Sequence, residues 1–502
     1  MDKGFEFRYF LNPSKSIYWN PDTAQNGHIG ITGGSGAGKT RLAKLLMEFL
    51  FNKGKNIHVV DVQNTLAVEN VPEEVFKFEV RNSAYSINPF EFLMDEKNGG
   101  PRAQIDDITE MFRKTFMKRL NSAPNLSAVL KRLIADTYRK AGIMDEDAST
   151  WGFGLSRKEL NERLPVIADM KELVDYILDF VSGGYGAKFS SIMASNGRNL
   201  NQWNTEMTRL TEELRKLEDV AGRDDEAVQK EKNRIMSEIN DLKSKVENKY
   251  GDLVGHFKEY LNYSFLGGDV PTYEALLTEE ESGYGWLDYK FYTNKDRLRT
   301  IGTIETYLQA LAETGVFGRS TPTPSFSKIN RYDLSSLKEE AKLFCSDILV
   351  SKVFRLVYLR GEYKALPIGN TIYKTRKAGT TTDTAIVIDE IQTLLPGTAA
   401  ESKDKSLLYN RVVSQIRNFG GLLMAITQTP ANFPELFLTN IGTMIILNTA
   451  ASDIPKVKAV TGIKDMNLFN QLEHRNKSGN FDVALMRDRG DWVAVRLPWF
   501  EE

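Results

Sequence analysis

Cysteine and histidine are scarce in this sequence of 502 residues. Cys345 is its only cysteine, so no intrachain disulfide can form, and a reducing compartment is expected. The four histidines are too scattered to show metal-ligand spacing, which argues against a histidine-based metal centre. They are His28, His58, His256 and His474.

Long apolar runs and a large net charge are absent as well. No stretch approaches the roughly 18 apolar residues that a membrane span needs, and the first ten residues lack a signal-peptide profile. The formal net charge of −2 argues against broad coating of nucleic acid, but it leaves room for a narrow pore lined by a few basic residues. We therefore expect a cytoplasmic protein of about two to four domains without a membrane partner.

A phosphate-binding pattern, G-x-x-x-x-G-K-[ST], lies near the start of the chain, within the segment GITGGSGAGKTRLAKLL. Its glycines let backbone N–H groups approach oxyanions, and the following helix presents its positive end to the same phosphates. Lys39 supplies a charge for the β- and γ-phosphates, and Thr40 supplies a hydroxyl for Mg²⁺. The alternative, an ordinary glycine-rich turn, is disfavoured because strand, loop and helix occur in this order. We predict that ATP and Mg²⁺ bind here, at Gly33, Gly34, Ser35, Gly36, Ala37, Gly38, Lys39, Thr40 and Arg41.

Short apolar runs separated by helix-length segments predict an α/β fold with a mainly parallel sheet. Strand patterns occur early in the chain and return late, and a long helical stretch lies between them. Asn88-Pro89 in SINPFEF marks the exit from the first group of strands. The predicted divisions are a short N-terminal segment (1–27), the first part of the core (28–98), a helical insertion (99–325) and the second part of the core (326–502).

Heptad spacing appears in two arms of the insertion, separated by a charged break. Each arm is about twenty residues long, which is too short for a dimerisation rod. We therefore predict that residues 204–249 form an antiparallel helical hairpin packed against itself. The apolar positions are Trp203, Met207, Leu210, Leu214 and Leu217 in the first arm, and Val228, Ile235, Ile239, Leu242 and Val246 in the second.

The segment AIVIDE is a buried-strand pattern that ends in two acidic residues. Asp389 is predicted to orient Mg²⁺, and Glu390 to polarise a water against the γ-phosphate as a general base. Strands of an open α/β sheet bind ligands at their carboxyl ends, so Lys39 and Asp389 can meet despite their separation in sequence. Asp61 is the rival metal residue, but it lacks a neighbouring glutamate, and we expect it to cap its strand or order a loop.

Two further residues are candidates for the catalytic machinery. Gln428 follows the strand LLMAIT and could sense the γ-phosphate, or it could simply begin the turn TQTPANFP. Arg417 could act as an arginine finger on a neighbouring subunit, or it could be a solvated arginine at a helix end. Arg411, Arg360 and Arg376 are the fallback candidates for the finger.

The chain resembles the HerA/FtsK superfamily of ring-forming ATPases, especially the HerA branch and its conjugative-secretion cousins. The resemblance is carried by HIGITGGSGAGKT, YSINPFEF, AIVIDEIQ, IRNFGGLLMAITQTPANFPELFLTNIGTMIILN and GNFDVALMRDRGDWVAVRLPW. It implies a RecA-like P-loop core, a homo-oligomer expected to be a hexamer, and ATP-driven movement on DNA. The chain departs from the family in its short N-terminal segment, where HerA proteins carry a small β-barrel, and in lacking the membrane spans of FtsK.

Three functions remain open from the sequence. The leading hypothesis is a DNA translocase or remodelling motor in a prokaryotic anti-phage defence or DNA-processing complex, with an effector or nuclease as partner. The alternatives are a soluble motor of a conjugative or secretion system, and an ATP-gated scaffold for a partner effector. The polar segments 373–382 and 396–406 could line a pore, although ordinary surface loops are an equal alternative.

Overall fold

The structure of the chain is a computed structural model. It describes residues 4–24, 26–96, 99–120, 125–182, 200, 202–217, 226–265, 286–292, 294–325, 327–362, 367–368, 371–372, 382–394, 408–430, 433, 435–472, 481–488 and 491–498. The chain divides into two compact units. The first unit comprises Met1–Lys171 and Ile304–Glu502, and the second, Glu172–Thr303, is inserted between these two parts of the first in the sequence.

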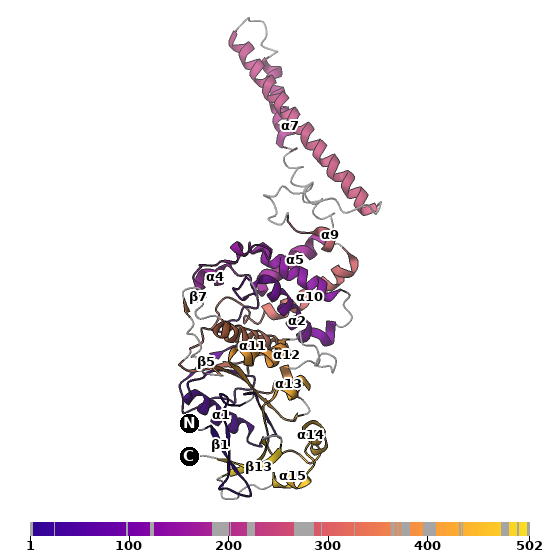
Figure 1. Cartoon of the computed structure of the whole chain (residues 1–502). Helices are drawn as coiled ribbons and strands as arrows, with labels where there is room; N and C mark the ends of the chain where they lie inside the picture. The colour runs from indigo at the N-terminus through magenta and orange to yellow at the C-terminus, as the bar shows by residue number, and fades with distance from the viewer. Residues whose placement is uncertain are drawn as a thin grey trace. The chain divides into compact units, whose positions relative to one another are not determined.

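Most strands described in the first unit belong to one sheet (Figure 1). Their bounds are β1 (Phe5–Tyr9), β2 (Ser16–Trp19), β3 (Ile29–Thr32), β4 (Asn56–Asp61), β5 (Glu73–Lys77), β6 (Ile329–Asp333), β9 (Thr384–Ile388), β10 (Gly421–Thr427), β11 (Thr443–Ile446), β12 (Phe481–Asp488) and β13 (Asp491–Pro498). The described part of the sheet has eleven strands in the order β2-β1-β13-β12-β11-β3-β10-β9-β4-β6-β5. The strands from β11 to β5 pair in parallel, whereas those from β2 to β11 pair antiparallel. A separate pair is formed by β7 (Pro367–Ile368) and β8 (Thr371–Ile372).

The central strands are buried on both faces, as the apolar runs predict. Every residue of β3, β4, β9 and β10 is buried. Alternate residues of a strand point to opposite faces, and those that face α1 (Lys39–Asn52) join its apolar stripe in one core. Helix α11 (Glu339–Glu362) also contacts β4 and β9. Helices on both faces explain why the strands read as continuous apolar runs rather than as alternating ones.

The structure describes the following further helices. The α-helices are α2 (Gly100–Leu120), α3 (Leu126–Lys140), α4 (Arg157–Arg163), α5 (Ile167–Ser182), α7 (Glu226–Phe265), α9 (Tyr289–Tyr292), α10 (Lys295–Ala312), α12 (Leu408–Gln415), α13 (Glu435–Asn440), α14 (Ile454–Thr461) and α15 (Met466–Gln471). The short 3₁₀ helices are η1 (Ala148–Trp151), η3 (Ile391–Leu394) and η5 (Ile416–Phe419).

The first residues of the chain contribute to the main sheet. Strand β1 pairs antiparallel with both β2 and β13, so the N-terminal and C-terminal segments lie side by side. Phe7 and Trp19 are buried in the same core as α1. The sequence analysis keeps residues 1–27 apart from the ATPase core, and that division of the chain stays a prediction.

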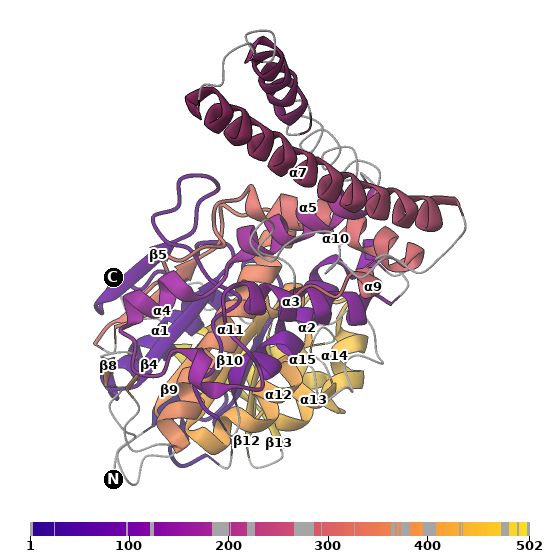
Figure 2. The ribbon, with the colours of Figure 1, turned by 90° about the horizontal axis from the view of Figure 1, so that it is seen from above.

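The second unit contains the hairpin that the heptad spacing predicts (Figure 2). Residues 202–217 are helical and pack along α7. Their shared core consists of Leu210, Ile235 and Ile239, against which Leu214, Leu217 and Leu242 are packed. All six are positions that the heptad analysis selects. The charged connection between the arms lies outside the described residues.

The chain therefore has a RecA-like α/β P-loop fold with a mainly parallel central sheet and a helical insertion, and the predicted fold class is confirmed. The antiparallel strands β1 and β2 were not predicted. Their short, half-buried patterns alternate weakly, and β13, with which they pair, lies almost at the other end of the chain.

Candidate nucleotide site

The parallel register brings three predicted segments to one edge of the sheet. Thr32, the last residue of β3, is aligned with Thr427 at the end of β10. Ile388 at the end of β9 is aligned with Ala425 of β10. The phosphate loop, the acidic pair and Gln428 therefore all begin at the carboxyl edge of neighbouring strands, where open α/β sheets hold their ligands.

The phosphate loop has the backbone geometry that its glycines allow. Gly36 and Gly38 have φ values of +71° and +91°, in the left-handed region that glycine adopts without strain. A Cβ at Gly33 would lie 2.9 Å from Cβ of Leu447, so a side chain there would collide with the end of β11. The amide of Gly34 donates a hydrogen bond of 2.7 Å to the carbonyl of Asn448. The loop is thus tied to its own sheet.

Lys39 is folded back over the phosphate loop. Its Nζ donates hydrogen bonds of 2.8 and 2.9 Å to the carbonyls of Gly33 and Gly34. Burial lowers the pKa of Lys39, while the carboxylates of Glu390 and Asp389 act in the opposite direction. The amine and both carboxylates therefore lie within electrostatic reach of one another, although they come from distant parts of the chain.

Asp389 is a buried carboxyl group held from two sides. Its Oδ2 accepts a hydrogen bond of 3.1 Å from Oγ1 of Thr65, and its Oδ1 accepts one of 3.0 Å from the backbone N–H of Glu390. Burial raises the pKa of Asp389 to about 6, and the charges of Glu390 and Asp61 contribute in the same direction. A cation at this carboxylate would relieve both costs.

Glu390 lies between two glutamine amides. Nε2 of Gln428 donates to Oε1 of Glu390 over 3.4 Å, and Nε2 of Gln392 donates to Oε2. Oε1 of Gln392 in turn accepts a hydrogen bond of 2.7 Å from the hydroxyl of Thr427. Glu390 itself has φ 49°, a left-handed conformation that is uncommon outside glycine and that concentrates at functional sites.

Asp61, the rival metal residue, organises a loop. Its carboxylate accepts backbone hydrogen bonds of 3.3, 3.1 and 3.0 Å from Gln63, Thr65 and Leu66. Nη1 of Arg331 donates to the same carboxylate over 3.2 Å. Asp61 thereby holds the segment that carries Thr65, the hydroxyl partner of Asp389.

Two contributors to this site escaped the sequence analysis. Gln392 lies within the segment AIVIDEIQ, two residues after Glu390, and its amide could have been suspected from that spacing. Thr65 offered no signal, because only the pairing of β4 with β9 brings it next to Asp389.

Arg417 lies where the parallel strands begin, whereas the phosphate loop lies where they end. It is an exposed residue of η5, which precedes β10, whereas Gln428 follows that strand. A seven-residue strand spans roughly 23 Å. Arg417 also affects His28 at the start of β3: burial lowers the pKa of His28 to about 4, and the Arg417 charge contributes to the lowering. Arg417 is therefore remote from the phosphate loop of its own chain.

The fallback arginines are placed differently. Arg411 is engaged in an ion pair, with Nη2 2.7 Å from Oδ1 of Asp107. The side chain of Arg360 and the whole of Arg376 lie outside the described residues, as do both candidate pore segments except for Thr382. No helix in the described part of the chain combines the length and the apolar composition required to cross a bilayer.

The side chains present fit a magnesium nucleotide. Glycine-rich backbone leads into α1, which begins with Lys39 and Thr40, and the buried carboxylate of Asp389 lies within electrostatic reach of the Lys39 amine. Within the described ranges no group of three His, Cys, Asp or Glu side chains could hold a metal ion alone. Such a set suits Mg²⁺, which is commonly bound through one or two protein groups together with substrate phosphates.

Comparisons with known proteins found similarity among solved structures. No family model matches the sequence, and the search of curated proteins found no match. Among solved structures, the chain is similar to VirB4 of Thermoanaerobacter pseudethanolicus, with a TM-score of 0.57 and 12% identity over 100% of this chain and 97% of that one. A weaker match is the bacterial conjugative coupling protein TrwBdeltaN70, with a TM-score of 0.38 and 11% identity over 94% of this chain and 84% of that one. The likeness to VirB4 establishes a shared fold.

Proposed function

We propose that the chain binds and hydrolyses ATP at the carboxyl edge of its central sheet. The observation that carries this proposal is the parallel register, which brings the phosphate loop with Lys39 and the acidic pair Asp389 and Glu390 to the carboxyl ends of neighbouring strands. Lys39, the loop amides and Thr40 would bind the phosphates, and Asp389 would hold Mg²⁺. When bound, Mg²⁺ supplies positive charge that offsets the charge of the phosphates.

Glu390 would accept a proton from the attacking water at one of its carboxylate oxygens. Gln392 and Gln428 would orient that carboxylate, and Gln428 would also sense the γ-phosphate. Glu390→Gln removes the base while leaving the phosphate loop intact. ATP turnover should fall about 10²- to 10⁴-fold, while a fluorescent ATP analogue still binds. Unchanged turnover would overturn the role of Glu390.

We further propose that the chain works as a homo-oligomer, in which Arg417 completes the site of a neighbouring subunit. Its exposed position at the opposite edge of the sheet supports action in trans. Mixing inactive Arg417→Ala subunits with inactive Glu390→Gln subunits should then restore part of the ATPase activity, because some interfaces combine an intact finger with an intact base. Native mass measurement of the same mixtures would give the ring number, which we expect to be six.

We propose that the chain serves as a soluble motor subunit of a conjugative or secretion-type transfer system. The similarity to VirB4 over nearly the full length of both chains favours this function over a DNA translocase of a defence complex. ATPase activity of the wild type should then change little when single- or double-stranded DNA is added. Strong stimulation by DNA, with binding that weakens steeply as salt rises, would instead support the DNA motor.

The second unit would provide the partner surface in either system. The hairpin has its own small core, and the described residues of the nucleotide site all belong to the first unit. Deletion of residues 204–249 should therefore abolish capture of the partner while ATP turnover persists. Loss of both would place the hairpin in the motor itself.

A further inference from the structure

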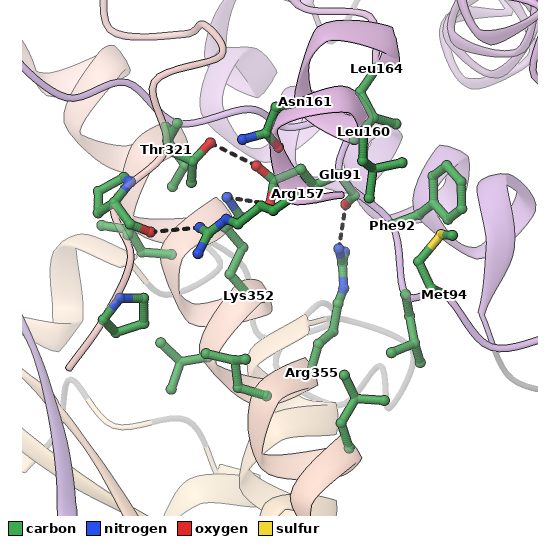
Figure 3. Close-up of a pocket in the computed structure, with 18 of the residues that line it drawn as sticks. Glu91, Phe92, Met94, Arg157, Leu160, Asn161, Leu164, Thr321, Lys352 and Arg355 are labelled. Atoms are coloured by element: carbon green, nitrogen blue, oxygen red, sulfur yellow. Dashed lines mark hydrogen bonds and ion pairs between the residues drawn. The ribbon is translucent and has the colours of Figure 1, made fainter. Parts of the chain in front are cut away.

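A cavity of about 140 Å³ lies in the first unit (Figure 3). Its walls are the segment 87–94 that leaves the sheet, helix α4, the segment 321–324 and helix α11. It shares no lining residue with the candidate nucleotide site.

The wall of this cavity is apolar over most of its surface and carries an excess of positive charge. Among the residues that line it, three are cationic, namely Arg157, Lys352 and Arg355, and one, Glu91, is a carboxylate. The apolar lining includes Phe92, Met94, Leu160, Leu164, Pro322 and Leu356. An apolar body combined with an anionic group matches such a wall.

The protein satisfies Glu91 and Arg355 by itself. Oε2 of Glu91 lies 2.6 Å from Nζ of Lys352, and Oε1 accepts a hydrogen bond of 2.7 Å from Thr321. The guanidinium of Arg355 donates to the carbonyl of Glu91 and also to the side chains of Gln104, Asp107 and Ser351. Glu91 and Arg355 are therefore held by contacts within the protein, and we do not assign ligand binding to them.

Arg157 and Lys352 carry the N–H donors that could bind a ligand in this cavity. In the described part of the chain, one hydrogen bond of the Arg157 guanidinium is shown, from Nη2 to the carbonyl of Pro322 at 3.0 Å. A guanidinium has five N–H donors and the ammonium of Lys352 has three. Arg157 and Lys352 flank Glu91 on the same side of the cavity (Figure 3).

The charges around Lys352 also favour binding of an anion. Burial lowers the pKa of Lys352, and the positive charges of Arg157 and Arg355 lower it further against the pull of Glu91. Glu91 pairs with Lys352 and Asp107 pairs with Arg355, yet Lys352 still lies among repelling cations, and an anion at this point would relieve that repulsion.

We propose that this cavity binds a small organic anion with a ring-sized apolar body and a carboxylate or phosphate group, which Arg157 and Lys352 recognise. The size is appropriate, since an apolar cavity of about 150 Å³ holds one benzene molecule. The anionic group would form charge-assisted hydrogen bonds with the guanidinium, which also favours planar bidentate anions. The proposal is independent of ATP hydrolysis.

The test uses fluorine NMR on the full-length chain, with 4-fluorobenzoate, 4-fluorophenyl phosphate and neutral 4-fluorobenzamide as probes. At least one anion should bind saturably, and about tenfold or more tightly than the amide. Whether the carboxylate or the phosphate binds better identifies the natural class. Arg157→Gln should weaken binding of the anion about tenfold, and Asn161→Phe, which fills the cavity, should remove it.

Matched controls separate this cavity from the rest of the protein. Arg163→Gln removes a positive charge from the same helix but not from the cavity wall, and it should leave binding unchanged. Lys39→Ala should also leave it unchanged, because the phosphate loop is elsewhere. Equal binding of the amide and the anions, no saturable binding of either anion, or full affinity in both Arg157→Gln and Asn161→Phe would overturn the proposal.

Discussion

The hydroxyl of Thr65 donates a hydrogen bond of 3.1 Å to the carboxylate of Asp389, although 324 residues separate the two in sequence. The contact exists because β4 and β9 are parallel neighbours, with Val60 aligned with Ile388. Asp61 fixes the loop that carries Thr65 through backbone hydrogen bonds. The hydroxyl of Thr65, in the loop after β4, therefore orients Asp389, the proposed metal ligand at the end of the neighbouring strand β9.

Thr65→Val tests this contact with little change of shape. The backbone N–H that binds Asp61 remains, so the loop should stay in place. The Thr65 hydrogen bond lowers the pKa of Asp389, so its loss should move the acid limb of the ATPase pH profile upward by about one unit. Thr461→Val, which removes a hydroxyl that donates to the carbonyl of Val457 within α14, is the matched control. Superimposable profiles for Thr65→Val and the wild type would contradict the assignment.

Asp389→Asn should stabilise the nucleotide-free protein while it removes ATPase activity. The pKa of Asp389 is raised from 3.8 to about 6, so the folded state binds the proton more tightly than the unfolded chain does. The resulting stability is complete below pH 3.8 and is lost as the pH rises through about 6. Above that pH, removing the buried charge should raise the free energy of unfolding by about 1–3 kcal/mol.

Thermal unfolding of Asp389→Asn over a range of pH checks this prediction. The difference from the wild type should shrink as the pH falls through the window between 6 and 3.8. Asp241→Asn, at a highly exposed position of α7, should show no comparable gain. A destabilised Asp389→Asn protein at neutral pH would show that the carboxylate is favourable without a cation.

Gln392→Leu should reduce kcat about ten- to hundredfold with little effect on the KM for ATP. The amide of Gln392 connects Glu390 to Thr427, so its loss frees the proposed base to rotate but leaves the phosphate loop untouched. Steady-state phosphate release as a function of ATP concentration separates the two constants. Gln415→Leu at the exposed end of α12 is the control, and a rise in KM at constant kcat would assign Gln392 to nucleotide binding instead.

Ile235→Ala should loosen the hairpin without changing ATP turnover. Ile235 is 1% exposed in the small core shared with Leu210, and its truncation should cost about 2–5 kcal/mol of local stability. Hydrogen exchange in residues 202–217 and in the first half of α7 should accelerate. Met236→Ala changes the next residue, which is 52% exposed, and should leave exchange unaltered. A parallel loss of ATPase activity in Ile235→Ala would couple the hairpin to the motor.

The sequence by itself determined the elements whose physical signal is local. The phosphate loop is readable because Gly33, Gly38, Lys39 and Thr40 meet their chemical requirements within eight residues. The hairpin core is readable because heptad spacing places Leu210 and Ile235 on the inner faces of their helices. Strands β9 and β10 are readable as apolar runs, because burial on both faces favours apolar residues.

Only the tertiary structure decided which distant residues share a site. Strand order and register place Thr65 beside Asp389, set Gln392 between Glu390 and Thr427, and keep Arg417 at the far edge of the sheet. The tertiary structure also brings Arg157 of α4 and Lys352 of α11 to the wall of one cavity. Such contacts depend on how strands separated by hundreds of residues pair, and no local spacing in the sequence encodes that pairing.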